Sequence, residues 1–193
     1  MTTSETIGAA ALADFTDLPR LGVRGAAAAT WLGAQGCLIP SAPNLLTAQP
    51  QGATLLRLSQ GEYLLLGSLA DEGSQVAAVD AALAADATPG VYALPRQDTH
   101  AWFWLGGARA VEVLAKLCGV DLRPKAFAAD AIAQTSVARL NAIVANAGSA
   151  ERPAFHLLVD RPSAEYFREA VLDAMSEFDG KEVDLAAVRQ YRQ

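Results

Sequence analysis

The fold is decided where a short apolar strand meets glycine, most clearly at residues 102–107, which read WFWLGG. A helix-like run follows, with Val111, Leu114 and Cys118 at helical spacing. The first half of the chain repeats this arrangement at residues 20–25, which read RLGVRG and lead into an alanine-rich run. Glycine suits both junctions because it tolerates positive φ and close backbone approach. The two stretches therefore predict an internal repeat.

A pair of strands and a closing helix follow in each half. In the first half, residues 54–59 and 62–67 flank Gln60-Gly61, which predicts a tight hairpin. In the second half, we expect strands at residues 135–144 and 155–160 on either side of a longer loop. Amphipathic helices are then predicted at residues 73–85 and from Ser163 onward.

Each half is thus predicted as strand–helix–strand–strand–helix, which places the protein in the α+β class with helices covering one face of a sheet. The halves span about residues 18–88 and 91–179. Their boundary at residues 88–90 is too short for a flexible linker, so we expect the halves to pack as one unit within a single domain.

Two terminal segments lie outside the repeats. Residues 1–14 are predicted to be a loose tail. Residues 180–193 are charged, with Leu185, Val188 and Tyr191 spaced by three. This second segment is either a frayed terminal helix or a docking segment for another chain.

Composition narrows the classes of partner. The 193 residues are 52 % hydrophobic and 19 % charged, which is the balance of a globular chain rather than a disordered one. The net charge of −6 and the lack of a basic cluster argue against nucleic acid. We expect no membrane span, because no apolar run approaches about 20 residues. With two isolated cysteines in apolar surroundings and no basic leader, we expect a cytoplasmic protein.

Motifs for chemistry are not found. The chain has no dinucleotide or nucleotide glycine loop and no nucleophile elbow. His100 and His156 are the two histidines, and neither lies within five residues of a cysteine or of the other. We therefore predict no catalytic, cofactor-binding or metal-binding residue on this chain.

Five residues are candidates for contact with another chain. Arg139 and Asn141 share one face of an otherwise apolar predicted strand. This indicates either an internal salt bridge or an edge strand, or else contact with another subunit or an anionic ligand. Trp102 and Trp104 share a face of their strand and serve either as core or as interface anchors. Tyr191 is the candidate in the C-terminal segment.

Several segments resemble the gamma subunits of heterotetrameric sarcosine oxidase. The distinctive ones lie in the second half: LPRQDTHAWF at 94–103, LCGVDLRPKAF at 117–127, AQTSVARLN at 133–141 and AEYF at 164–167. In the first half, GCLIP at 36–40 and GEYLLLG at 61–67 are suggestive. The resemblance extends from about Leu18 to Phe178.

This resemblance implies a fold similar to the N-terminal folate-binding region of the glycine-cleavage T-protein. It also implies alpha, beta and delta subunits as partners, in an assembly for sarcosine catabolism that oxidatively demethylates sarcosine to glycine. The family holds FAD, FMN, NAD and tetrahydrofolate on the other subunits, and assigns no catalytic residue to the gamma chain. We expect a non-catalytic subunit that can self-associate when isolated.

A second hypothesis follows from the fold alone: a stand-alone folate-binding or aminomethyltransferase-like protein with a pocket between the halves. Related iron–sulfur-repair folate proteins carry a K-G-C-x-x-G-Q motif. Residues 35–40 here read QGCLIP, which lacks the lysine, the second glycine and the final glutamine. The departure weighs against this alternative.

Overall fold

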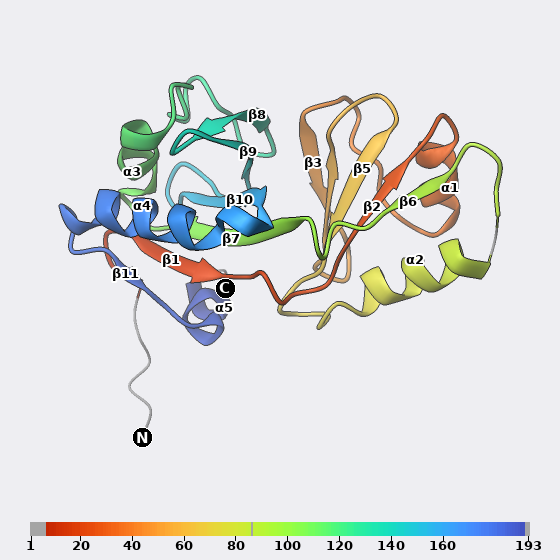
Figure 1. Ribbon diagram of the computed structural model, residues 1–193, viewed down its shortest axis with the longest axis horizontal. Helices are drawn as coiled ribbons and strands as arrows, with labels where there is room; N and C mark the ends of the chain where they lie inside the picture. Colours follow the sequence, from red (N-terminus) through yellow and green to blue (C-terminus); the bar gives the residue numbers. More distant parts are fainter. Residues whose placement is uncertain (1–6, 86, 192–193) are drawn as a thin grey trace. The chain divides into compact units, whose positions relative to one another are not determined.

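The computed structural model describes residues 7–85 and 87–191 (Figure 1). The chain divides into two compact units. One unit, called here the contiguous unit, comprises residues 17–99. The other, called the split unit, combines residues 1–16 with residues 100–193. Each is an α+β unit, in agreement with the predicted class.

The contiguous unit is a five-stranded sheet with two helices. Its elements are β2 (Arg20–Arg24), α1 (Ala28–Ala34), β3 (Leu45–Ala48), β4 (Thr54–Arg57), β5 (Glu62–Leu66), α2 (Ser74–Ala85) and β6 (Tyr92–Leu94). The strand order is β3-β4-β5-β2-β6, and each neighbouring pair is antiparallel. The predicted hairpin around Gln60-Gly61 is confirmed by the pairing of β4 with β5.

The split unit has a six-stranded sheet. Its elements are β1 (Ala11–Asp14), β7 (His100–Gly106), α3 (Ala110–Leu117), β8 (Ile132–Val137), β9 (Leu140–Asn146), β10 (Ala154–Asp160), a 3-10 turn η1 (Arg161–Ser163), α4 (Ala164–Ser176), β11 (Lys181–Glu182) and α5 (Leu185–Tyr191). The order is β11-β1-β7-β10-β9-β8, antiparallel except for β1 with β11.

Strand β7 shows how the two faces of this sheet are used. Its side chains alternate between faces. Phe103 faces α4 and stacks on Phe167, with ring centroids 5.5 Å apart. Trp104 faces the opposite way and meets Tyr191 of α5, also at 5.5 Å. Helices α3 and α4 therefore cover one face, and α5 lies against the other.

The predicted strand–glycine–helix junctions are present in both units. Gly25 has φ +138°, and an added Cβ would lie 1.9 Å from the Gly90 oxygen. Gly107 has φ +111°, and an added Cβ would lie 2.6 Å from the Ala9 oxygen. In each case a second segment of the chain passes so close to the junction that only glycine fits.

Those passing segments lead into equivalent strands. Two residues after each glycine, a backbone N–H donates to the passing segment: Ala27 to Gly90 (3.2 Å) and Arg109 to Ala9 (2.7 Å). The first segment continues into β6, which pairs with β2, and the second into β1, which pairs with β7. Each repeat therefore sends its leading strand into the sheet of the other repeat.

The exchange of leading strands corrects the predicted tail at residues 1–14. Residues 1–6 lie outside the described part of the chain, but residues 11–14 form β1. Ala11, Leu12 and Ala13 are at most 1 % exposed, because β1 sits between β7 and β11. This short apolar run is stabilised by sheet neighbours that are distant in sequence, β7 in the middle of the chain and β11 near its end.

The predicted repeat also has one strand too few. Three strands, not two, separate the helices in each unit: β3, β4 and β5 in one, β8, β9 and β10 in the other. In the second repeat, the predicted strand at residues 135–144 is a hairpin with its turn at Ala138-Arg139. The turn lacks the asparagine and glycine that usually mark such hairpins. The alternating pattern of side chains therefore predicted one continuous strand across it.

Candidate interaction surface and pockets

The two tryptophans proposed as interface anchors lie in the core. Trp102 is 1 % exposed, and its Nε1–H donates to Nδ1 of His156 at 3.0 Å. The ring also makes an edge contact with Phe15, with centroids 5.1 Å apart. Nδ1 of His156 is the acceptor of the hydrogen bond from the indole. Trp102 is thus a packing residue with a satisfied indole, and the prediction of an interface role is corrected.

Trp104 and Tyr191 hold the C-terminal helix on its own unit. Trp104 is fully buried. The Tyr191 hydroxyl donates to the Pro153 oxygen at 3.2 Å, and burial raises the pKa of Tyr191. The Arg152 guanidinium donates to the backbone carbonyl oxygen of Tyr191. Helix α5 is therefore docked within the chain, and residues 185–191 are neither frayed nor free for another subunit. Residues 192–193 lie outside the described part.

Arg139 and Asn141 are on the surface, not within a buried strand. Arg139 occupies the β8–β9 turn, where φ is +49° at Ala138 and +67° at Arg139. Positive φ at both central residues is the requirement of a type I′ turn. Asn141 is exposed on β9, opposite Ser136. Both residues are accessible to a partner, although the buried environment predicted for them is wrong.

Two exposed hydrophobic residues lie on segments that are bonded to this hairpin. Tyr166, in the first turn of α4, is 51 % exposed, and its hydroxyl donates to the Ala138 oxygen at 3.1 Å. Val120 is 38 % exposed. It lies two residues after Cys118, whose backbone forms an isolated β-bridge with Val137 at the end of β8. The sequence offered a signal for Tyr166, since it lies off the apolar stripe of its helix.

The buried Arg20 is occupied by its own unit. It is 4 % exposed, and its guanidinium donates to backbone oxygens of Leu18 (3.1 Å), Arg96 (3.1 Å) and Gln97 (2.9 Å). These bonds join β2 to the segment that leaves the contiguous unit. A guanidinium satisfied by carbonyl groups stabilises the fold and is unsuited to recruit an anion.

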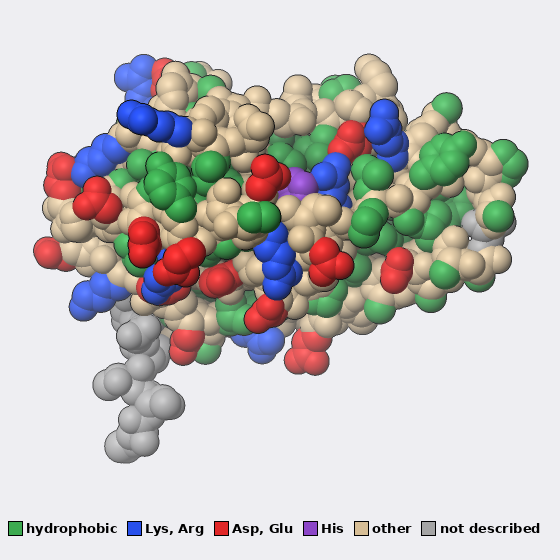
Figure 2. All heavy atoms as spheres, viewed as in Figure 1, with side chains coloured by type: hydrophobic (Ala, Val, Ile, Leu, Met, Phe, Trp, Pro, Cys, Tyr) green, Lys and Arg blue, Asp and Glu red, His purple; other side chains and the backbone are tan. Residues whose placement is uncertain are grey.

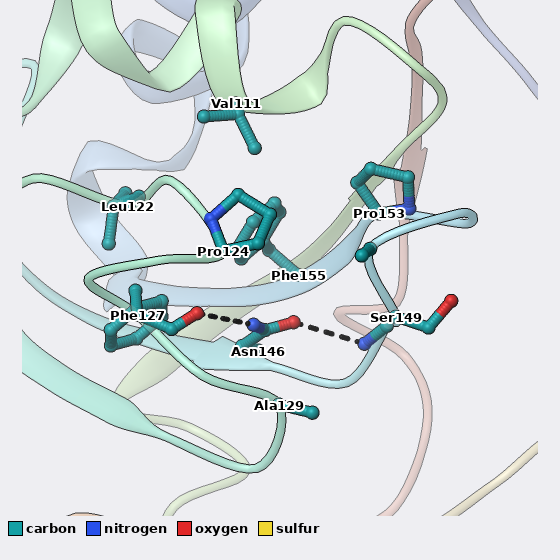
Figure 3. A pocket seen from close by; sticks show the side chains of 11 residues that line it. Val111, Leu122, Pro124, Phe127, Ala129, Asn146, Ser149, Pro153 and Phe155 are labelled. Atoms are coloured by element: carbon teal, nitrogen blue, oxygen red, sulfur yellow. Dashed lines mark hydrogen bonds between the residues drawn. The ribbon is translucent and has the colours of Figure 1, made fainter.

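One cavity of the split unit holds about 30 Å³ and is drawn in Figure 3. Apolar side chains line it, among them Val111, Leu122 and Phe155. Asn146 is its buried amide: Nδ2 donates to the Phe127 oxygen, and Oδ1 accepts from the Gly148 N–H (Figure 3). Nδ2 also donates to the Ala128 oxygen. This volume suits one water molecule. The Asn146 amide is fully used in holding the backbone segments on either side of the cavity.

A larger depression of about 330 Å³ lies beside the same loop. It is lined by Ala147, Gly148, Ser149, Arg152, Ala154 and Tyr191. The volume is at the lower end of small-molecule sites. However, Ser149 bonds Glu151 and Arg152 bonds Tyr191, so its polar groups serve the protein itself.

Charges on the surface are mixed. On the face drawn in Figure 2, acidic, basic and hydrophobic side chains alternate, and neither sign of charge gathers in a broad patch. Among residues 7–85 and 87–191, no group of three or more His, Cys, Asp or Glu is placed to hold a metal ion. Within the same residues, no helix has the length and apolar character to cross a membrane.

Comparison with solved structures defines the class of fold. A chain of the heterotetrameric sarcosine oxidase from Corynebacterium sp. U-96 matches with a TM-score of 0.75 and 26 % identity, over 93 % of this chain and 91 % of that one. Aminomethyltransferase T of the glycine cleavage system from Bartonella henselae matches with a TM-score of 0.69 and 18 % identity. That match covers 97 % of this chain and 51 % of the enzyme. The protein therefore has the T-protein-like folate-binding fold, as predicted.

The sequence comparison is more particular. No protein-family model matches the chain. Sarcosine oxidase subunit gamma of Corynebacterium sp. (strain P-1) is 28 % identical over 150 residues, which cover 78 % of this chain and 70 % of the relative. The chain is homologous to the gamma subunit of sarcosine oxidase, which confirms the resemblance found in the sequence.

Proposed function

We propose that this protein is the gamma subunit of a heterotetrameric sarcosine oxidase, an assembly that oxidatively demethylates sarcosine to glycine. The observation that carries the proposal is the 28 % identity to a curated gamma subunit over 78 % of the chain. The structural match over 93 % of the chain also supports it, because the match extends through both units. We propose a cytoplasmic location for the assembly.

In this proposal the chain's role is structural. Alpha, beta and delta subunits are its partners, and they hold FAD, FMN, NAD and tetrahydrofolate. The chemistry of the described residues fits such a division of labour: Arg20, Asn146 and the Trp102–His156 pair are all used in internal hydrogen bonds. A fold shared with an aminomethyltransferase does not by itself assign folate to this chain.

The test is affinity purification of the tagged chain from its source organism, with mass spectrometry and an absorption spectrum. We expect large partner chains in fixed proportion, a flavin spectrum, and sarcosine-dependent reduction of that flavin. Recovery of the chain alone and colourless, from cells that express the partners, would contradict the proposal.

Tetrahydrofolate titration of the isolated chain separates the subunit from a stand-alone folate binder. We expect no shift in the melting temperature and no heat of binding. Saturable binding by the isolated chain would favour the alternative.

A further inference from the structure

Three segments meet at the β8–β9 turn of the split unit, and each presents an exposed side chain on the surface. We call this surface the turn patch and define it by Val120, Arg139 and Tyr166. The Tyr166 hydroxyl donates to the Ala138 oxygen at 3.1 Å, and the Ala138 N–H donates to the Leu117 oxygen at 2.9 Å. Both backbone groups of Ala138 are therefore held by other elements, and the turn is fixed between α3 and α4.

Arg139 is an uncompensated cation at the tip of this patch. In the part of the chain that the structure describes, no hydrogen bond or ion pair involves its guanidinium. The acidic residues beside the other two members are already paired. Asp121, next to Val120, binds Arg123, and Glu165, next to Tyr166, binds Arg168.

The two hydrophobic residues of the turn patch, Tyr166 and Val120, expose apolar side-chain surface to solvent. Tyr166 is 51 % exposed although its hydroxyl is tied down, so its ring is held in one orientation. Val120 adds a second apolar contact at 38 % exposure. Tyrosine and arginine are residue types that dominate binding energy at protein interfaces.

From these features we propose that the turn patch docks another subunit of the assembly, through a surface that offers a carboxylate flanked by apolar side chains. The inference rests on the proposed function and adds the place and chemistry of the contact. A carboxylate would pair with the Arg139 fork, and its apolar surroundings would cover Val120 and Tyr166. A second copy of this chain is disfavoured, because a two-fold contact would bring two unpaired Arg139 side chains into one interface.

The experiment uses the assembly that co-purifies with the wild-type chain. Its partner chains are separated and recombined with variants, and binding is measured against salt concentration. We expect Arg139→Glu and the double change Val120→Ser with Tyr166→Ser each to weaken binding by about 10-fold or more. Arg139→Gln should weaken binding less than Arg139→Glu and flatten its salt dependence.

A matched control comes from the contiguous unit, where Leu38 and Tyr92 are 51 % and 64 % exposed. Leu38→Ser with Tyr92→Ser should bind like the wild type. The Arg139 variants should keep the wild-type melting temperature, since Arg139 is exposed. The double change at Val120 and Tyr166 also removes the bond from the Tyr166 hydroxyl to the Ala138 oxygen, so its binding is measured well below its own melting temperature.

A photo-crosslinker at position 166 identifies the occupant. A crosslink to a partner segment that contains Asp or Glu supports the inference. Wild-type binding by the turn-patch variants, or a crosslink to a second copy of this chain, would overturn it while leaving the proposed function intact. If the wild-type chain captures no flavoprotein chains, both proposals fall.

Discussion

At the residue scale, paired polar groups in the interior decide which side chains matter to stability. The Trp102 indole bonds His156 in the core of the split unit. Trp31, at 6 % exposure in the contiguous unit, has an Nε1 without a partner among the described residues. The two tryptophans are comparably buried and differ in whether the indole N–H is used.

This contrast gives a prediction for Trp102→Phe. The change removes the donor to His156 as well as ring volume, and should lower the free energy of unfolding by about 2–4 kcal/mol. Trp31→Phe removes volume alone and should cost less. Urea unfolding monitored by circular dichroism measures both. Equal losses would show that the Trp102–His156 bond adds no net stability.

Asp71 caps the start of α2 and links stability to pH. Burial alone would raise the pKa of Asp71, but N–H groups of Gly73, Ser68 and Gln75 donate to it, and the net pKa lies below 3.8. A lowered folded-state pKa means stability that is present above 3.8 and lost as pH falls through the folded value.

Asp71→Asn should therefore lower the free energy of unfolding by about 1 kcal/mol at pH 7. The difference from wild type should shrink as pH falls below 3.8, because the wild-type carboxylate becomes protonated. Unfolding curves of both proteins between about pH 3 and pH 7, a range that includes the titration of an aspartate, measure this difference. A difference independent of pH would rule out the carboxylate charge as the cause.

At the element scale, the β8–β9 turn holds two non-glycine residues at positive φ. Each costs about 1 kcal/mol relative to glycine in that conformation. Arg139→Gly should therefore stabilise the chain by up to about 1 kcal/mol, whereas Arg139→Ala keeps the strain and should be nearly neutral. Thermal unfolding of the two variants separates backbone strain from the loss of charge. Stabilisation by alanine as large as by glycine would contradict the assignment.

At the strand–glycine–helix junctions, replacing glycine by a larger residue should lower stability. Gly25→Ala would place a Cβ against the Gly90 oxygen and should destabilise the contiguous unit by several kcal/mol. Gly119→Ala meets nothing within 4 Å and should be close to neutral. Expression of soluble protein and melting temperature report the difference. A well-folded Gly25→Ala variant would mean that the passing segment can move away.

At the scale of the whole molecule, the sequence predicts local architecture better than long-range pairing. The repeat, the class of fold and the β4–β5 hairpin follow from glycine positions and periodicity, which are local properties. The place of β1 could not be predicted, because its buried position depends on neighbours in β7 and β11. The five residues predicted to contact another chain also fall into two groups. Arg139 and Asn141 are accessible, whereas Trp102, Trp104 and Tyr191 are used by the chain itself.

The packing of the two halves as one unit stays a prediction. The family resemblance contributed what periodicity could not, since it rests on whole segments such as residues 94–103 and 117–127. Sequence alternation also concealed the Ala138-Arg139 turn, and the turn patch depends on the fold to bring α3, α4 and the hairpin together.

The exchanged leading strands impose an order on biosynthesis. Residues 17–99 form a unit without interruption, so this unit can fold as it leaves the ribosome. Strand β1 is translated earlier, yet Leu12 has no sheet partner until Leu105 of β7 has emerged, and Lys181 of β11 comes later still. The first segment made is thus among the last to be secured. A nascent chain stalled midway would expose β1 as an unpaired apolar strand, open to capture by chaperones.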